Sequence, residues 1–582
     1  MPGFLSVAMK NIERTHVPAG EIRDSIPATY RVALDFRDGI DRIRSWFFSR
    51  DPVYWPVFSD PVFAKIVKFR ETRQPARARV QHYPDGEMLL SQLRGQDRVP
   101  AESRDPAGGV DPLLVFAAAL SKNWEDPASV ENVITSPSDP ALFGSMTGVL
   151  ANPNLVHPEY SEMAGELESM VIRQMATLAG YDPGQATGIF TQGGTLCNLY
   201  GYLLGIRKSL PHSRDLGLEY GQDYRIINSS VGHYSNMTNL SLLGVNIRRK
   251  TIRIRATDNN DMDLADLEQQ LTACFQLGCV VPTIMLTMGT TDTFGVDLVR
   301  PVCEVRDRLC RQFEVSVKPH IHVDSAIGWP LLFFLDYDFQ SNPLRINAAT
   351  LPGLRRNVER FRELRLADSF IIDFQKWGYV PYTSSLVLIK NRADIKALEH
   401  DEEYFSYFEK SVEGQTHLHS TIECSRGGAG VFGAHAALQC LGVQGFQRLI
   451  ANTLQNANYF RFRLSGVPGV KLMAAQNQGP SVGFRLYDPE RVSDVEAEFD
   501  FEYHLQDSPQ YRERVDRNTR YHREVFLQRG KAGLYTNWVE FIAHTGYDAR
   551  GRYGALPGEK AVFLNPRTRY EDIDQFIAAI RG

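Results

Sequence analysis

A lysine lies between two apolar, strand-like runs. The stretch "DFQKWGY", residues 373–379, places Lys376 between "ADSFII" and "SSLVLIKN". An amine in a loop that joins two buried strands can act as a nucleophile toward a carbonyl group. A simple charge on a surface loop is the alternative that this lysine alone leaves open, so its meaning depends on the motifs around it.

A glycine cluster offers a site for an anion. The segment "GIFTQGGTLCNLYGYLLGIR" predicts a short strand, a tight turn at Gly193, Gly194 and Thr195, and then a helix. The first turn of a helix presents backbone N–H groups that have no partner within the helix, and such groups bind phosphate. Gly194 and Thr195 are therefore candidate phosphate ligands. An ordinary glycine turn with Thr195 as the helix N-cap is the alternative.

Three side chains that could hold a charge alternate along "HIHVD": His320, His322 and Asp324. Successive side chains of a strand point to opposite faces, so these three share one face of a predicted strand. Two histidines and one carboxylate can bind a metal, but three ligands from one strand crowd poorly around a single ion. We therefore predict no metal site and favour Asp324 as the buried partner of a cation.

The stretch "GGAGVFG", residues 427–433, has the G-x-G-x-x-G spacing of dinucleotide-binding folds. No strong strand precedes it, and the next acidic residue is Asp488. Because the strand and the ribose-binding acid are both missing, we predict no nicotinamide site there.

A carboxylate at a strand end, a phosphate-binding helix start and a lysine between strands together match the needs of pyridoxal phosphate. Lysine forms a Schiff base with this cofactor, an acid keeps its pyridine nitrogen protonated, and backbone N–H groups bind its phosphate. In order and context these motifs resemble those of the group II pyridoxal-phosphate-dependent amino-acid decarboxylases, which include glutamate, tyrosine, aspartate and aromatic-amino-acid decarboxylases. The resemblance runs from "FGSMTGVLANPNLVHPEYSEMAGELESMV" through "SSLVLIKN" and is weaker at "FLNPRTRYEDIDQF".

The resemblance gives the first three motifs a role. "FTQGGTLCN" corresponds to the phosphate loop, which implicates Gly194 and Thr195. "GHYSNMTNLSLLGV" corresponds to the segment whose histidine stacks on the cofactor ring, here His233. "TMGTTDTFGVD" supplies Thr291 near the ring and its 3′ oxygen. A helix-capping His233 and a turn residue Thr291 are the alternatives for each position taken singly.

Two further motifs complete the implied cofactor site. "HVDSAIG" carries Asp324 for the pyridine nitrogen and Ala326 against the other ring face, and "DFQKWGYVPY" carries the Schiff-base lysine, Lys376, with Asp373 in the adjoining phosphate-side turn. Most family members have a histidine at the position of Gln375. Glutamine keeps a hydrogen-bond donor but does not titrate, so we expect Gln375 to be a neutral donor to the phosphate or the substrate carboxylate.

The arrangement of elements fits the same family. Helical segments such as "ELESMVIRQMATLAGY" alternate with buried-strand runs such as "CVVPTIMLTMG", which predicts a parallel sheet covered by helices. The resemblance implies an α/β protein of fold type I, with a mostly parallel seven-stranded sheet, helices on both faces and a smaller C-terminal α+β domain. We expect an N-terminal arm and dimerisation segment at 1–115, a large cofactor-binding domain at 116–394 and the small domain at 395–582. The charge-dense segment 488–526 is predicted to be a solvated helical insertion.

Composition excludes several classes of protein. A hydrophobic content of 43% and a net charge of −5 in 582 residues describe a globular protein rather than a nucleic-acid-binding or disordered one. The seven cysteines are odd in number and form no C-x-x-C pair, which favours a reducing cytoplasm. No run reaches the roughly 18 apolar residues of a membrane span, and we read neither a signal sequence nor a membrane anchor.

The resemblance also implies a reaction, the decarboxylation of an L-amino acid to a primary amine and CO2. In the family, a tyrosine on a loop that reaches the neighbouring subunit's site returns a proton to Cα. The matching region is 400–426, where Tyr404 and Tyr407 are candidates and His417 and His419 could assist. A homodimer with active sites at its interface, wrapped by the aromatic N-terminal arm, is expected by the same analogy.

Other functions stay open at this stage. "KWGYVPYTSSLVLI" also resembles the sphingosine-phosphate lyases, which cleave a carbon–carbon bond by a retro-aldol reaction without loss of CO2. A decarboxylation-dependent oxidative deaminase would release an aldehyde instead of an amine. A cofactor-binding or degenerate structural protein is a third possibility, which only Gln375 supports. The sequence does not identify the side chain of the substrate.

Overall fold

The structure is a computed structural model, and it describes most of the chain after residue 120. The described residues are 26–44, 88, 90, 91, 94, 95, 98, 99, 101, 117, 121–400, 417, 419–529, 534–548 and 551–581. Tyr404 and Tyr407, and most of the predicted N-terminal arm, lie outside them.

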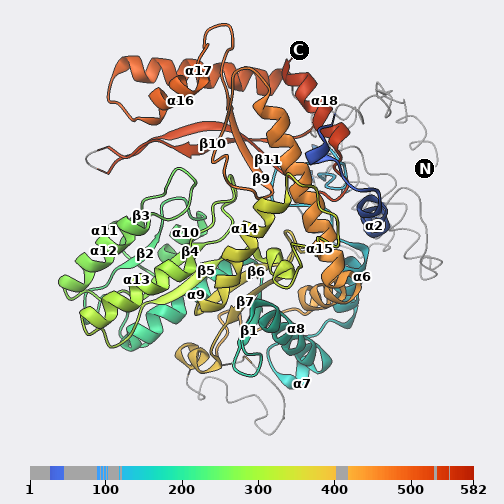
Figure 1. The fold of residues 1–582 in the computed structure, drawn as a ribbon. Helices are drawn as coiled ribbons and strands as arrows, with labels where there is room; N and C mark the ends of the chain where they lie inside the picture. The colour runs from blue at the N-terminus through green and yellow to red at the C-terminus, as the bar shows by residue number, and fades with distance from the viewer. Residues whose placement is uncertain are drawn as a thin grey trace.

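A seven-stranded sheet forms the centre of the molecule (Figure 1), with the strand order β1-β7-β6-β5-β4-β2-β3. Its strands are β1 (Thr187–Thr191), β2 (Ile226–Ser229), β3 (Thr251–Ile254), β4 (Thr283–Thr287), β5 (His320–Asp324), β6 (Ser369–Asp373) and β7 (Ser385–Ile389). Strand β7 runs antiparallel to both of its neighbours, and the other pairs are parallel. The predicted mostly parallel sheet of seven strands is confirmed.

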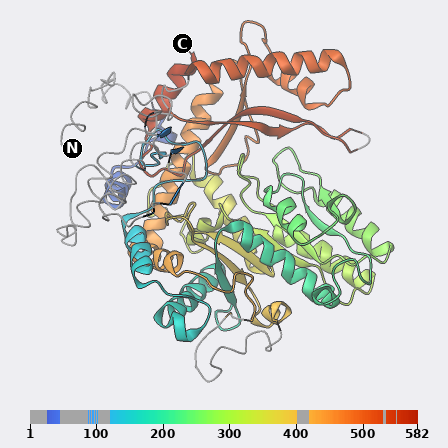
Figure 2. The same cartoon turned by 180° about the vertical axis from the view of Figure 1, so that it is seen from behind.

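Helices cover both faces of this sheet. The described helices of both layers are α2 (Leu34–Arg44), α6 (Asp139–Ala151), α7 (Pro158–Ser161), α8 (Met163–Ala179), α9 (Gly194–Ser209), α10 (Ser235–Leu242), α11 (Ile247–Lys250), α12 (Leu264–Gln276), α13 (Val299–Gln312), α14 (Leu351–Phe361), α15 (Ala429–Ser465), α16 (Val495–Tyr503), α17 (Pro509–Arg529) and α18 (Tyr570–Arg581), and the last three belong to the smaller C-terminal layer. Helix α9 lies across one face, which Figure 2 presents, and α8, α12, α13 and α14 pack on the other.

Alternation along the strands sorts side chains between these two layers. In β6, Ile371 packs in the cluster under α9, whereas Phe370 and Ile372 belong to the main core on the opposite face. Every residue of β1, β4, β5, β6 and β7 is buried, as expected for strands that are covered on both sides. The sheet is therefore a rigid platform for the loops that leave its strands.

A second sheet, which is smaller and antiparallel, has the order β10-β11-β9-β8. Its strands are β8 (Val470–Leu472), β9 (Ser481–Leu486), β10 (Asn537–His544) and β11 (Ala555–Val562). Helix α15 contacts α6 and α8 of the larger layer as well as β8, β9 and α18 of the smaller one. Figure 1 shows α15 running from beside α6 to the smaller sheet. Its helical backbone is interrupted at Gly442, and the part after this kink packs on the cores of both layers.

The predicted helical structure of residues 488–526 is confirmed and most of their side chains reach solvent, but one side of the segment is buried, which the prediction of a solvated insertion did not include. These residues form α16 and most of α17, whose inner sides bury the polar residues Glu498, Glu502, Asn518 and His522. Both side chains of the Arg485–Glu502 pair are fully buried, with Nε to Oε2 at 2.7 Å. The sequence of this segment is highly charged although part of it is buried, because its buried charged side chains pair with charges of opposite sign in the interior of this layer.

The described part of the N-terminal arm packs on its own chain. Phe36, Ile40 and Ile43 of α2 are buried in the main core, and Tyr30 stacks on Phe462 of α15 at 4.6 Å between ring centroids. In these described ranges we find no helix that combines the length and the hydropathy needed to cross a membrane.

Glu502→Gln should destabilise the smaller layer strongly. The substitution keeps the shape of the side chain but leaves the Arg485 guanidinium buried without its anionic partner, which costs about 3–5 kcal/mol in the free energy of unfolding. The control is Glu496→Gln, because Glu496 pairs with Lys471 while its side chain is 75% exposed. We expect a change below about 1 kcal/mol for the control in chemical denaturation. Equal changes in the two variants would contradict this account.

Candidate active site

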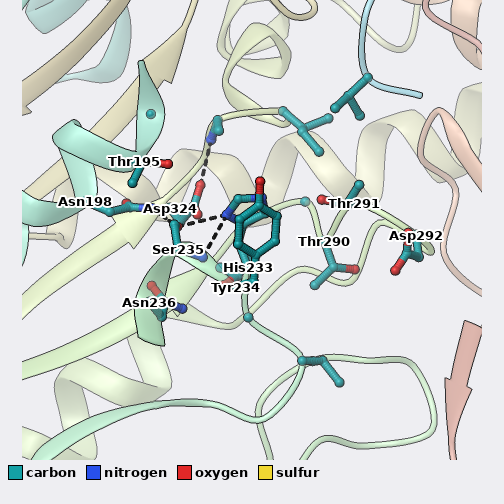
Figure 3. A pocket seen from close by; sticks show the side chains of 18 of the residues that line it. Thr195, Asn198, His233, Tyr234, Ser235, Asn236, Thr290, Thr291, Asp292 and Asp324 are labelled. Carbon is teal, nitrogen blue, oxygen red and sulfur yellow. Dashed lines mark hydrogen bonds between the residues drawn. The ribbon is translucent and has the colours of Figure 1, made fainter. Parts of the chain in front are cut away.

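A cavity of about 990 Å³ lies at the carboxyl ends of the parallel strands (Figure 3). The loops that follow β1, β2, β4, β5 and β6 line its floor, and Phe541, Ile542, Tyr553 and Lys560 of the smaller sheet line the opposite wall. Open α/β sheets bind their ligands at this edge. The structure thus brings the candidate motifs, which are separated by up to almost 200 residues, to one place.

Two glycines open helix α9 toward this cavity. Gly193 is the N-cap with φ 131°, a conformation that other L-residues rarely adopt, and Thr195 is therefore not the cap. A Cβ on Gly194 would lie only 2.7 Å from Oδ2 of Asp373. The free N–H groups at this helix start fit a phosphate group, and the missing side chains leave room for it.

Asp324 is buried at the end of β5, and its carboxylate has defined donors. Nδ2 of Asn198 donates to Oδ2 at 2.9 Å, and the backbone N–H of Ala326 donates to Oδ1 at 3.2 Å. Only 6% of Asp324 is exposed. A buried acid of this kind fits a cationic ring nitrogen.

Lys376 points into the same cavity, with its Nζ 3.0 Å from Oδ2 of Asp373. Burial by itself lowers the pKa of Lys376, but the charges of Asp373 and Asp324 outweigh burial and raise this pKa above its usual value. Ser385 Oγ donates to the other oxygen of Asp373 at 2.6 Å. The amine is therefore held in place by an acid that is itself fixed.

His233 also lines the cavity, just before α10. Its Nδ1 accepts from the backbone N–H of Ser235 at 3.3 Å and lies 2.8 Å from the Oγ of the same residue. Burial lowers the pKa of His233, and Asp324 opposes that effect. The bond to Ser235 agrees with a helix-capping role. The imidazole also lines the cavity, and its contact with a cofactor ring stays a prediction.

Gln375 lines the cavity, but both ends of its amide already have partners in the chain. Its Nε2 donates to Oγ of Ser385 at 2.8 Å, and its Oε1 accepts from the backbone N–H of Ser384 at 2.8 Å. The side chain thus ties the end of β6 to the start of β7. Through Ser385 it acts on Asp373, which differs from the predicted contact with a phosphate or a substrate carboxylate.

The wall after β4 holds Thr291 and the acidic side chain of Asp292. Asp292 Oδ1 lies 2.7 Å from Nζ of Lys560, which comes from β11 of the smaller sheet. The Lys560 side chain is only 5% exposed. This ion pair closes the cavity between the two sheets and puts both signs of charge on its outer wall.

Several predicted residues lie away from this cluster. His417 is half-buried near Glu168 and Arg426, and desolvation of its ring lowers its pKa to about 4. Neither His417 nor His419 is among the residues that line the described cavity. Within the described chain no group of three or more histidine, cysteine or acidic side chains could hold a metal ion.

Asn198 is the functional residue that the motifs did not single out. It lies four residues after Gly194 on α9, so it belongs to the same helix face and reaches the cavity below the phosphate turn. Tyr382 likewise lines the cavity near Lys376. The helical spacing from Gly194 could have predicted that Asn198 lies at the cavity. The position of Tyr382 depends on the conformation of a loop, which no spacing in the sequence predicts.

The family model described as "Pyridoxal-dependent decarboxylase conserved domain" matches residues 115–487. The chain belongs to this family. The predicted family, the pyridoxal phosphate cofactor and the class of enzyme are thereby confirmed, and decarboxylation is the supported reaction. The matches give no support to the retro-aldol lyase.

Similar proteins come from different substrate classes. An L-2,4-diaminobutyrate decarboxylase of Rhizobium meliloti (strain 1021) is 23% identical over 78% of this chain and 77% of its own length. An L-tyrosine decarboxylase of Enterococcus faecium is 29% identical, but the alignment covers only 39% of each chain. The crystal structure of mouse CSAD has a TM-score of 0.68 at 18% identity, covering 91% of this chain and 99% of that one, and shows the shared fold.

Gly194→Ala should weaken binding of pyridoxal phosphate to this decarboxylase. The new methyl group would press on the Asp373 carboxylate, and such overpacking costs about 1–3 kcal/mol, or about 5- to 150-fold in affinity. The measurement is an absorption titration of the apoprotein with the cofactor. Gly427→Ala is the control, because a Cβ there meets no atom within 4 Å. Equal affinity in the Gly194 variant and the wild type would refute the phosphate assignment.

Proposed function

We propose that this decarboxylase converts an L-amino acid to the corresponding primary amine in the cavity at the carboxyl edge of the larger sheet. One observation carries the proposal: Lys376, Asp324 and the start of α9 line a single cavity. Each of the three would hold a different part of pyridoxal phosphate. When bound, that cofactor supplies a ring that accepts the electrons left on Cα as CO2 departs.

Lys376 is the proposed point of attachment for the cofactor. Its ion pair with Asp373 keeps the amine at the floor of the cavity. Because a nucleophilic amine must be neutral, the raised pKa of Lys376 means that the amine has to lose a proton before it can attach the cofactor.

Asp324 is the proposed partner of the ring nitrogen. Its negative charge favours a protonated nitrogen, which strengthens the ring as an electron acceptor. We assign phosphate binding to the backbone N–H groups of Gly194 and Thr195. His233 and Ala326 would lie against the two ring faces.

Thr291 is the proposed neighbour of the 3′ oxygen. For Gln375 we propose a positioning role: its bonds to Ser384 and Ser385 orient Asp373 beside the lysine. This replaces the role of a direct donor to phosphate or substrate.

Lys376→Ala should abolish both the visible absorption of the bound cofactor and turnover, while the protein stays folded. The assay incubates the wild type with pooled L-amino acids and detects loss of CO2 by mass spectrometry, which also identifies the substrate. A Lys376→Ala protein that still retained the cofactor covalently after borohydride reduction would overturn the assignment. Gln340→Ala, on an exposed turn, is the control for effects of substitution and purification that do not involve the cavity.

A proton must return to Cα after CO2 has left, and three tyrosines are candidates for its donor. Tyr404 and Tyr407 carry the family resemblance and lie outside the described residues. Tyr382 lines the cavity, and a phenol keeps its proton at neutral pH. Position therefore supports Tyr382 in addition to the loop residues.

Replacing the donor by phenylalanine should lower the yield of amine but allow CO2 loss to continue. We expect the responsible variant among Tyr382→Phe, Tyr404→Phe and Tyr407→Phe to raise the ratio of aldehyde to amine, measured by chromatography of the products. Tyr160→Phe, at an exposed position on α7, is the control. If all three ratios equal that of the control, the donor is another group.

The Asp292–Lys560 pair is the proposed contact for a charged group of the substrate. It places two opposite charges on the cavity wall, and each partner could exchange its present bond for one to the ligand. The names of the similar proteins indicate substrates whose side chains differ in charge. The assay with pooled amino acids therefore has to show whether Asp292 or Lys560 contacts the substrate.

We also propose a cytoplasmic homodimer, with an arm at 1–115, a large domain at 116–394 and a small domain at 395–582. Exposed apolar side chains support a partner surface: Leu150 of α6 is 82% exposed and Met163 of α8 is 65% exposed. Tyr234 and Tyr382 at the cavity are also largely exposed, as expected if a second subunit completes the site.

A further inference from the structure

The two histidines of "HIHVD" belong to a chain of hydrogen bonds that ends on Asp324. His320 Nε2 lies 2.7 Å from Ser369 Oγ, and the same oxygen lies 2.6 Å from His322 Nδ1. His322 Nε2 is 3.2 Å from Oδ1 of Asn198, whose Nδ2 donates to Asp324 at 2.9 Å. All five residues are buried, with no more than 6% of any of them exposed.

The direction of every bond follows from the last one. A carboxylate only accepts, so Asn198 turns its N–H toward Asp324 and its oxygen toward His322. His322 must then carry its proton on Nε2, and as a neutral imidazole it accepts at Nδ1 from the hydroxyl of Ser369. Ser369 has only one proton, so it accepts in turn from Nε2–H of His320.

The burial of the two imidazoles agrees with this pattern. Burial lowers the pKa of both His320 and His322 to about 3, so each ring is neutral and has a single N–H. Nδ1 of His320 has no hydrogen-bond partner among the described residues. A lone pair is less costly there than an N–H group without a partner, which again puts the proton on Nε2.

Asn198 serves a second branch with its other N–H. Its Nδ2 lies 3.4 Å from Oγ of Ser235, and that oxygen lies 2.8 Å from Nδ1 of His233. Because this Nδ1 already accepts from the backbone N–H of Ser235, the hydroxyl also donates to it. Figure 3 shows Asn198, Ser235 and His233 grouped around Asp324. One carboxamide therefore fixes both the acid and the imidazole of the cavity.

We propose that Asn198 and His322 are positioning residues that hold Asp324 and His233 for the cofactor, with His322 preventing the carboxamide of Asn198 from turning over. A flipped carboxamide would point its oxygen at the carboxylate and repel it. His322 prevents this because its N–H needs the oxygen of Asn198. The inference rests on the proposed function, in which Asp324 faces the ring nitrogen.

The test compares two phenylalanine variants in the same strand. His322→Phe keeps a buried ring against Gly201 but removes the N–H that locks Asn198. His320→Phe makes the same chemical change at the far end of the chain, where Ser369 can still donate to His322. We expect the dissociation constant for pyridoxal phosphate, measured by fluorescence quenching of the apoprotein, to rise about 10- to 100-fold for His322→Phe. For His320→Phe we expect a rise of less than about threefold, since only the polarisation along the chain is lost.

Two further measurements separate positioning from folding. His322→Gln retains an N–H donor and should recover most of the affinity, whereas a purely structural role predicts losses that follow thermal stability in all three variants. In the wild-type apoprotein, ¹⁵N NMR of labelled histidine should find His322 and His320 as neutral Nε2–H tautomers. This measurement needs neither cofactor nor substrate and holds even if His322→Phe fails to fold.

The outcomes are distinct. Wild-type cofactor affinity in folded His322→Phe, or an Nδ1–H tautomer of His322, would overturn the inference while leaving the proposed function intact. Equal losses in His320→Phe and His322→Phe would also overturn it. A wild-type protein that binds the cofactor but releases no CO2 from any amino acid would instead refute the proposed function, and the hydrogen-bond chain would still stand on the NMR result.

Discussion

A carboxylate that is buried needs hydrogen bonds or an opposite charge, and the placement of Asp324 imposes this need on the centre of the protein. Its side-chain donor, Asn198, comes from helix α9, so the helix has to lie very close to strand β5. Glycines make this approach possible: a Cβ on Gly201 would lie 2.3 Å from the ring of His322, and one on Gly205 would lie 2.1 Å from Oγ1 of Thr283. The small residues of α9 therefore set the depth at which Asn198 meets the acid.

The same helix begins at the cavity, which links two parts of the site mechanically. Gly194 at its first turn is proposed to hold the phosphate, and Asn198 one turn later holds Asp324, the proposed partner of the ring nitrogen. Because the two positions belong to one rigid α-helix, the distance between them is fixed by its 1.5 Å rise per residue and not by a flexible loop. Helix α9 therefore sets the spacing between the proposed phosphate site and the proposed site of the ring nitrogen. Side chains from the loops supply the other residues of the cavity.

The smaller sheet reaches the cavity by the alternation of β11. Glu559 faces α17, where it meets His522 and Arg529, and the next residue, Lys560, points the other way toward Asp292. Adjacent residues of a strand lie on opposite faces, so the buried charges under α17 fix the strand that presents the lysine. The stability of that polar interior and the shape of the outer cavity wall are therefore connected.

How far the sequence leads depends on whether a feature is local. The alternation of "HIHVD" predicts that His320, His322 and Asp324 share a face, and Gly201 on α9 contacts the ring of His322 from that side. The strand, turn and helix around Gly194 are local as well. The bond from Asn198 to Asp324 spans 126 residues, and no spacing in the sequence predicts it. The segment 488–526 misleads for the same reason, since the partners that bury its charges lie on other elements.

The glutamine beside the lysine shows why a departure from a motif needs the structure for its interpretation. A neutral imidazole has one donor and one acceptor, but they lie on different sides of a rigid ring. The carboxamide of Gln375 carries both at one end, which lets it accept from the N–H of Ser384 and donate to the hydroxyl of Ser385, two adjacent residues at the start of β7. Ser385 then has its own proton free for Asp373. Gln375 thus helps to hold Asp373 beside Lys376 through Ser385. A substitution of Gln375 therefore has to be interpreted together with the position of Asp373.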